Sequence, residues 1–408
     1  MPMPIALPNI SAGKESAIMK MIGVSEVSVD FTRTIVIPLI LIGTSGCASV
    51  AASNEELCSS KSSTIGSGAD CSKPSGTANV DAVSRVKSEL RQMKGYKRDE
   101  GQTYLTLPEW YLVYSPAEYA QYMKDKPPSG FPYFGAIGQF WGYYSDVNDV
   151  RKDRYPFNAG YQTMVVVIGT SFTAENTIKG LYENTIGRVT EWTRGDAMTD
   201  EDKFAAKVAQ DYVNFIRVEP WYEYSFAHQL KNLWGETDFF GSNMIRKLER
   251  KLFLSAEYSV KAVYATLITV ATKAAYGDAD NEILALAKDV PHDALKDEPK
   301  VKVVKEFEES FVLLSLPRYE EFRDVLLRLV RKGVRFTEIA GNEEILVTCI
   351  VPANWSYDLP SGKALFERPI LTDPNQKRIA IGAPVKSLHD ILIRLMERNI
   401  SVEHIYDY

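Results

Sequence analysis

The sequence predicts an α+β protein with a mainly helical, aromatic-rich middle domain and a small C-terminal domain of strands and helices. Between residues 81 and 290, apolar side chains recur three or four positions apart, which is the spacing of amphipathic helices. From about residue 300, short apolar runs of strand length alternate with amphipathic helices. A charged, proline-bounded stretch at 289–300 separates the two patterns and is typical of a linker. We therefore expect folded domains at 81–290 and 300–408.

Composition is that of an ordinary globular protein. The chain has 408 residues, of which 45% are hydrophobic and 25% charged, and this length suffices for two domains with cores of their own. Its 47 basic and 53 acidic residues are interspersed without a basic block, so we expect no nucleic-acid partner. The cysteines form no CxxC pair and the few histidines do not cluster, so we predict neither a metal site nor a cofactor.

The N-terminal segment carries a short apolar run at residues 35–43, preceded by an arginine and followed by small residues. Such a run is too short for a comfortable membrane span and is typical of a signal-peptide core. With Gly46 and Cys47 behind it, the segment resembles a bacterial lipoprotein signal, and the resemblance implies that Cys47 becomes the lipidated N-terminus. Cleavage after Ala52 and an uncleaved anchor are the alternatives.

Behind the leader at 1–47, residues 48–80 are rich in small and polar side chains and have no apolar periodicity. Such a segment buries too little surface to offset the entropy of ordering it, so we predict a flexible tether. Within it, Cys58 and Cys71 could close a small disulfide loop, or remain free thiols. We therefore expect a protein anchored to a membrane of the cell envelope, with a periplasmic or secreted protein as the alternative.

The middle domain contains two segments that are dense in aromatic side chains, at 104–144 and 220–234. Aromatic side chains at helical spacing form either a core or an aromatic-lined pocket for an amphipathic ligand. Four ionisable residues of this domain are candidate acid/base groups for such a pocket. The candidates are Glu109, Glu175, Glu223 and His228.

Each candidate also has a structural interpretation. Glu175, Lys179 and Glu183 follow one another four positions apart, so on a helix they form an acid–base–acid ladder. Such a ladder could shift the pKa of a catalytic carboxylate, or it could be a salt-bridged face. Glu223 and His228 could exchange a proton, but five positions apart on a helix they point in different directions. No nucleophile motif or metal-binding motif accompanies any of these residues.

Arg246, Lys247, Arg250 and Lys251 place four positive charges on one short helix, which leads into the uncharged segment 262–272. We interpret these four residues as a membrane-surface site that attracts anionic lipid headgroups. The alternative is a buried apolar helix with a solvated basic neighbour.

The C-terminal pattern changes to strands and helices. Strands are predicted at 301–316, 334–339, 345–351, 365–371, 379–381 and 402–406, and helices at 319–332 and 385–398. This order resembles the ferredoxin-like split βαβ arrangement. Residues 399–406 also resemble the last strand of small-molecule-sensing domains of the ACT type, which implies a regulatory ligand site. An interaction or oligomerisation module is the other use of such a domain.

Three functions are consistent with these observations. The first is a membrane-tethered, non-catalytic envelope protein that contacts lipid through its N-terminus and binds a protein partner or a small ligand. The second is an enzyme that acts on an amphipathic or lipid-like substrate in the aromatic pocket. The third is a metabolite sensor that uses its C-terminal domain. Because no catalytic signature is present, we expect the first.

Overall fold

The computed structural model describes residues 76–93, 95–98, 101–194, 198–276 and 281–406. The predicted leader lies outside the described residues, and so do Cys47, Cys58 and Cys71. From Val80 onward the described residues belong to one compact unit. In this part of the chain, no helix combines the length and the apolar character that crossing a bilayer requires.

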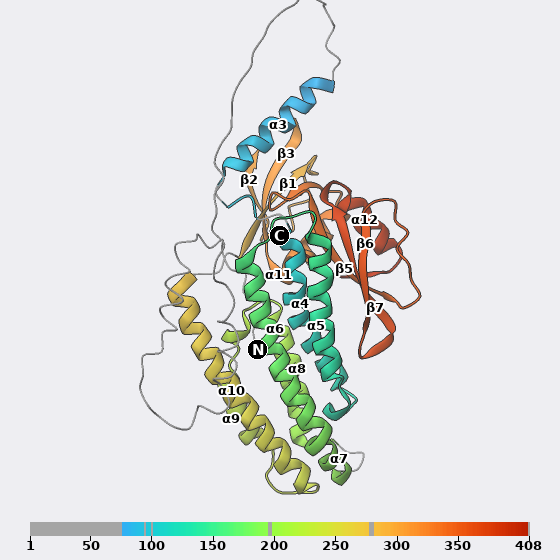
Figure 1. The fold of residues 1–408 in the computed structure, drawn as a ribbon. Coiled ribbons are helices and arrows are strands. Elements are labelled where there is room, and N and C mark those ends of the chain that lie inside the picture. The colour runs from blue at the N-terminus through green and yellow to red at the C-terminus, as the bar shows by residue number, and fades with distance from the viewer. Residues whose placement is uncertain (1–75, 94, 99–100, 195–197, 277–280, 407–408) are drawn as a thin grey trace, which may run out of the picture. The chain divides into compact units, whose positions relative to one another are not determined.

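The α+β prediction is confirmed, because the middle region is helical and the C-terminal region consists of antiparallel strands with two helices (Figure 1). The helices before the sheets are α3 (Gly76–Gln92), α4 (Gln102–Tyr122), α5 (Tyr133–Arg151), α6 (Ala159–Tyr182), α7 (Arg188–Arg194), α8 (Asp200–Ile216), α9 (Phe226–Glu236) and α10 (Met244–Tyr276). Helix α8 begins with a capping box, in which Thr199 and Asp202 bond each other's backbone amides, and its first turn is acidic.

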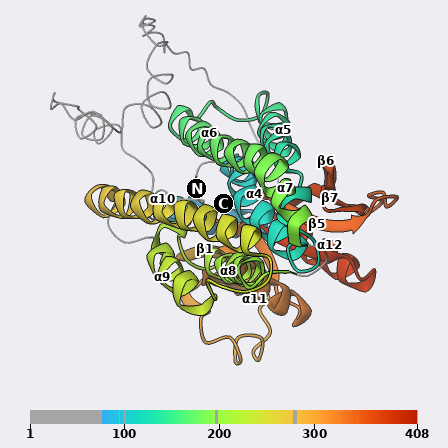
Figure 2. The ribbon, with the colours of Figure 1, turned by 90° about the horizontal axis from the view of Figure 1, so that it is seen from below.

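Helix α4 lies in the middle of the helical layer. Figure 2 shows α5 and α6 on one side of it and α8 on the other. Its side chains from Thr103 to Pro116 are all buried, and Pro108 and Pro116 lie within the continuous helix. The aromatic core around α4 extends to Leu346 and Ala380, which belong to the C-terminal strands. Helix α4 therefore connects the helical layer to the sheets.

The C-terminal region contains two four-stranded antiparallel sheets. Sheet A consists of β1 (Glu282–Lys288), β2 (Lys302–Glu306), β3 (Phe311–Pro317) and β4 (Arg335–Ile339), and sheet B of β5 (Glu344–Pro352), β6 (Lys363–Ile370), β7 (Asp373–Pro384) and β8 (Ser401–Ile405). Helix α11 (Tyr319–Arg331) precedes β4 and α12 (Val385–Glu397) precedes β8. The strand orders are β2-β3-β1-β4 and β6-β7-β5-β8, so the two sheets repeat one topology.

The two modules also repeat in sequence. Glu-Ile-Leu opens both β1 and β5, and the stretches 324–339 and 390–405 have Asp, Leu, Arg, Leu and Ile at equivalent positions. Gly333 and Asn399 follow α11 and α12 with left-handed φ angles of 90° and 55°, the conformation that commonly ends a helix. The inner faces of both sheets and both helices share one apolar core.

The single split βαβ sheet expected for the C-terminal region is not confirmed. Strand β1 precedes the predicted linker at 289–300 and pairs with both β3 and β4, and the predicted strand 301–316 is two strands, β2 and β3. Strand β1 was not predicted, because a short apolar run at the end of a long helical region has no periodicity of its own.

Candidate functional site

The four candidate acid/base residues lie in different environments. Glu109 is buried within α4, and Glu175 lies on α6 in a group of ion pairs. Glu223 is exposed in the short turn Trp221–Glu223, and His228 is exposed on α9. None of the four lines either of the two cavities described below. The structure thus does not bring them together as one acid/base site.

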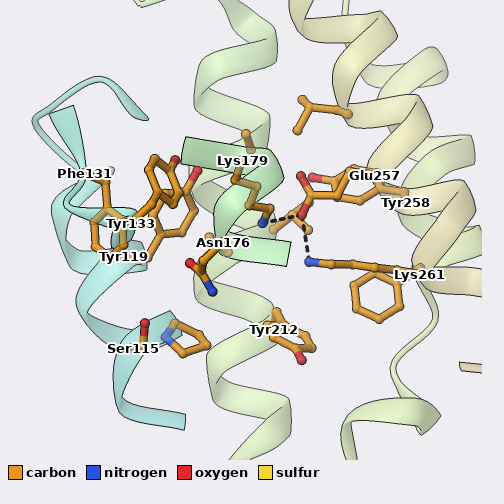
Figure 3. A pocket seen from close by; sticks show the side chains of 16 residues that line it. Ser115, Tyr119, Phe131, Tyr133, Asn176, Lys179, Tyr212, Glu257, Tyr258 and Lys261 are labelled. Carbon is orange, nitrogen blue, oxygen red and sulfur yellow. Dashed lines mark hydrogen bonds and ion pairs between the residues drawn. The ribbon is translucent and has the colours of Figure 1, made fainter. Parts of the chain in front are cut away.

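Glu175 belongs to a quartet of alternating charges between α6 and α10. Lys179 lies 3.1 Å from Glu175 and 2.6 Å from Glu257, and Lys261 lies 3.2 Å from Glu175 and 2.7 Å from Glu257. Figure 3 shows both lysines reaching the Glu257 carboxylate. The side chains are only 12–16% exposed, and their formal charges cancel.

Electrostatics keep Glu175, Glu257 and Lys179 charged. Burial alone would raise the pKa of Glu175, but the ammonium groups of Lys261 and Lys179 hold it at about 2. Burial opposes the charge of Glu257 as well, and the same two lysines hold the pKa of Glu257 well below its usual range. Burial would lower the pKa of Lys179, and the two carboxylates raise it well above the ordinary value instead. Each charge is compensated by two opposite ones.

The quartet borders a cavity of about 70 Å³, which is large enough for a few water molecules. Its aromatic lining consists of Tyr119, Phe131, Tyr133, Tyr212, Phe226 and Tyr258. Tyr119, Phe131 and Tyr133 belong to the predicted aromatic segment 104–144, and Phe226 belongs to the segment 220–234. The acidic group that lines the cavity is Glu257, which the sequence analysis missed. Its sequence signal is the spacing of four residues between Glu257 and Lys261 on one helix.

The predicted membrane-surface site at Arg246, Lys247, Arg250 and Lys251 is wrong. These side chains are 0%, 6%, 1% and 2% exposed, respectively, so none of them faces a membrane surface. The ladder expected from Glu175, Lys179 and Glu183 forms only in part. Lys179 pairs with Glu175, whereas Glu183 accepts a hydrogen bond from Arg250 at 2.7 Å.

These basic side chains are buried because they pair with acidic and carbonyl groups that are distant from them in the sequence. Arg246 donates to Asp202 at 2.8 Å, and Lys247 lies 3.3 Å from Asp200; both acids belong to the first turn of α8. Lys251 donates to the carbonyl oxygen of Thr237 at 2.6 Å. A buried charge persists only when it is paired and hydrogen-bonded, and these are.

A second cavity of about 400 Å³ lies between α4, α11 and sheet B. Its charged and hydrogen-bonding lining consists of Glu118, Gln121, Arg217, Glu320, Arg323, Thr372, Asp373, Gln376, Arg378, Glu403 and His404, and its aromatic lining of Trp110 and Tyr114. The His404 ring contacts the Trp110 ring, with 3.6 Å between centroids and an interplanar angle of 33°. None of these residues was predicted as a site residue, because they come from segments that are far apart in the chain.

Arg378 forms the inner wall of this cavity. It donates two hydrogen bonds to Glu403, at 2.5 and 2.7 Å, one to Glu118 at 3.1 Å and one to Tyr143 at 3.2 Å. Its guanidinium also lies 4.3 Å from the ring centre of Tyr114. Burial raises the pKa of the Glu118 carboxyl even though Arg378 is close. One buried arginine therefore joins α4, α5, β7 and β8.

Comparisons with known proteins add no functional assignment. No protein-family model matches the chain, and neither a curated protein nor a solved structure is significantly similar to it. Among the described residues, no group of three His, Cys, Asp or Glu side chains is placed to hold a metal ion. The candidate site is therefore defined by geometry alone, and it is the cavity at Arg378.

Proposed function

We propose that the protein is a non-catalytic binding protein of the cell envelope, tethered to a membrane by its N-terminus, which holds a small molecule in the cavity at Arg378. The cavity carries this proposal. Its volume of about 400 Å³ lies in the range of small-molecule sites, and polar groups from α4, α11, β7 and β8 converge on it. The lipoprotein-like segment around Cys47 supports the tether.

The lining favours a small zwitterionic ligand with an apolar part. Arg217, Arg323 and Arg378 supply positive charge, and Glu118, Glu320, Asp373 and Glu403 supply negative charge. An anion or a cation alone would face like charges in this wall, whereas a ligand of mixed charge meets opposite ones. The Trp110 and Tyr114 rings offer contact to an apolar group. The metabolite-sensing hypothesis is part of this proposal, because β7, β8 and α11 contribute to the wall.

Filling the cavity tests the proposal. Ala117 lines the cavity from α4, so Ala117→Phe should occupy ligand space, whereas Ala353→Phe places the same side chain at an exposed position after β5. The measurement is a thermal-shift screen with free amino acids, betaines and dipeptides as probes. At least one probe should raise the melting temperature of the wild type and of Ala353→Phe, but not of Ala117→Phe. A probe that stabilises all three equally, or the lack of any stabilising probe, contradicts the assignment.

A second candidate is an enzyme acting on an amphipathic or lipid-like substrate in the aromatic cavity beside Glu257. The observation in its favour is a carboxylate between two lysines under six aromatic rings. We place it second because the cavity is about 70 Å³, well below the volume of a typical small-molecule site. Hydrolysis of an amphipathic ester by the wild type that is lost in Glu257→Gln, under conditions in which circular dichroism shows the variant to be folded, would reverse this order.

We also propose that each C-terminal module is a reduced form of the ferredoxin-like arrangement. Each has three strands, a helix and a fourth strand beside the first, in one antiparallel sheet. A helix between the first two strands would complete the split βαβ pattern. This architecture hosts many functions, so it supports the fold assignment only.

A further inference from the structure

The outward side of α10 is apolar over most of its length. Its large exposed side chains are Ile245, Leu248, Leu252, Val260, Val263 and Leu267, which are 46–69% exposed. They follow one another three or four positions apart within each half of the helix, so they form one stripe. Every exposed side chain of α10 from Met244 to Leu267 is uncharged. This stripe has the pattern of a core-facing surface, yet it faces outward.

The neighbouring helix α6 has the same property. Val167, Ile178 and Leu181 are 56–61% exposed, and the exposed side chains from Thr163 to Ile186 are all uncharged. The two helices run antiparallel, because contacts pair Glu175 with Lys261 and then Tyr182 with Phe253, whose rings stack at 3.9 Å. Figure 2 shows α6 and α10 at the outside of the helical layer. We call their combined outward side the apolar face.

The charges of both helices are on the opposite side from this face. The quartet at Glu175 and Glu257 lies between α6 and α10, and Arg246 and Arg250 are at most 1% exposed. A surface helix of a water-soluble protein has the reverse arrangement, with charges in water and apolar groups inside. Isolated exposed apolar residues are ordinary, whereas two adjacent stripes without charge mark an interaction surface.

Three threonine hydroxyl groups on the apolar face are satisfied within their own helices. Thr170 donates to the carbonyl oxygen of Val166 at 2.8 Å, and Thr185 donates to that of Leu181 at 2.7 Å. On α10, Thr266 donates to the carbonyl oxygen of Ala262 at 2.9 Å. Because these donors are used within their own helices, the face offers few hydrogen bonds to a partner. Apolar lipid requires none, whereas a protein interface typically contains about one hydrogen bond per 100–200 Å².

We propose that the apolar face docks the folded body on a lipid bilayer, with α6 and α10 lying in the plane of one leaflet and their outward side chains among the acyl chains. The stripe from Ile245 to Leu267 is about 33 Å long at 1.5 Å per residue. Trp192, 82% exposed on α7, lies beyond the end of α6, and indole rings favour the headgroup boundary of a membrane. This site goes beyond the proposed ligand cavity and beyond the N-terminal tether.

Matched charge insertions test the docking. The protein is the full chain with Cys47→Ser, so that no lipid is attached at that position, and the probe is phosphatidylcholine vesicles in a flotation assay. Val260→Glu with Val263→Glu places two carboxylates on the apolar face. Val303→Glu with Val304→Glu is the control, since both valines are 46% exposed on β2, away from α6 and α10. Melting temperatures establish that all forms fold.

We expect the face variant to partition into vesicles at least about tenfold less than the control variant, because ionised carboxylates resist burial in hydrocarbon. Raising the salt concentration should leave the binding of the control variant unchanged, since apolar insertion is not screened. Phosphatidylcholine that carries bromine on its acyl chains should quench part of the tryptophan fluorescence. This quenched part should be missing in Trp192→Phe, because it comes from Trp192. This second measurement does not depend on how strongly the leader binds.

Equal flotation of both variants together with unquenched Trp192 would overturn the proposal. Sedimentation without vesicles tests whether a second copy of the chain covers the face instead of lipid. A control variant that is dimeric and a face variant that is monomeric would identify the apolar face as a contact between copies of this chain. Binding that requires anionic lipid and disappears in salt would likewise overturn it. The ligand screen at Ala117 is independent of all these outcomes, so the two proposals fail separately.

Discussion

The Nζ atom of Lys179 on α6 lies 2.6 Å from a carboxylate oxygen of Glu257 on α10, and this contact connects the two helices that carry the apolar face. Both side chains are about 15% exposed, so each charge depends on the other for the solvation that water would otherwise supply. Their shared neighbours, Glu175 and Lys261, close the network to zero net charge.

Removing one charge from the quartet should destabilise the protein strongly. In Glu257→Gln, two buried lysines share one carboxylate, and breaking a buried pair in this way costs about 3–5 kcal/mol. The control is Glu236→Gln, because Glu236 is 48% exposed and pairs with Lys207 at 3.3 Å on the surface. Its loss should cost at most about 1 kcal/mol. Urea unfolding measures both, and equal losses would mean that the quartet contributes no more than a surface pair.

The quartet also predicts the response to acid. The pKa of Glu175 is about 2 in the folded protein, below its ordinary value of 4.5. A carboxyl group with a lowered pKa stabilises the fold above about pH 4.5, and this contribution disappears as the pH falls toward 2. We expect the free energy of unfolding to decrease across that window. Glu175→Gln should flatten the decrease, and an unchanged slope in urea titrations between pH 2 and 5 would argue against the shift.

Arg378 should not tolerate replacement by lysine. An ammonium group cannot reproduce the two-pronged contact to Glu403 together with the bonds to Glu118 and Tyr143. We expect Arg378→Lys to cost about 2–4 kcal/mol of unfolding free energy, since hydrogen bonds to charged groups contribute about 1.5–3 kcal/mol each. Arg335→Lys is the control, because Arg335 makes a comparable two-pronged contact to Asp390 while 52% exposed. Similar losses of unfolding free energy at both positions would mean that burial does not strengthen the contribution of the arginine.

The C-terminal region should fold by itself only when β1 is included. Strand β1 lies between β3 and β4 and pairs with both, so a fragment of residues 301–408 lacks an inner strand of sheet A. We expect residues 281–408 to give a cooperative melt and dispersed amide spectra, and residues 301–408 to give neither. A cooperative melt of the shorter fragment would show that sheet B and α12 suffice.

The lipoprotein-like leader predicts a covalent lipid at Cys47. Cys47→Ser should abolish incorporation of a labelled fatty acid, whereas Cys58→Ser, in the tether, should leave incorporation intact. The readout is label in the purified full chain after growth with the fatty acid. Persistent labelling of the Cys47→Ser protein would assign the lipid to another residue.

Local signals in the sequence identified several elements correctly. The helices predicted at 319–332 and 385–398 are α11 and α12, because the periodicity of an amphipathic helix depends on residues only a few positions apart. The change from helices to strands along the chain could also be predicted, because it depends on the local spacing of apolar side chains.

Pairing between distant segments could not be predicted in the same way. The basic run at Arg246 looked like a surface, because its partners Asp202 and Glu183 lie more than 40 residues earlier. The wall at Arg378 joins α4 to β8, and no spacing rule connects them. The repeat of Glu-Ile-Leu in β1 and β5 was visible in the sequence, and it indicates the two-module architecture.

The two repeated modules lie in one chain, so they need not make identical contacts. The two halves of a symmetric dimer carry identical residues, whereas two modules in one chain can carry different residues at equivalent positions. Glu338 in β4 and His404 in β8 occupy equivalent positions next to the end of their strands. Glu338 accepts a hydrogen bond from Tyr96 at 2.7 Å, whereas the His404 ring contacts Trp110 of α4. The equivalent positions Glu338 and His404 therefore contact two different parts of the preceding chain, which two identical modules related by exact symmetry could not do.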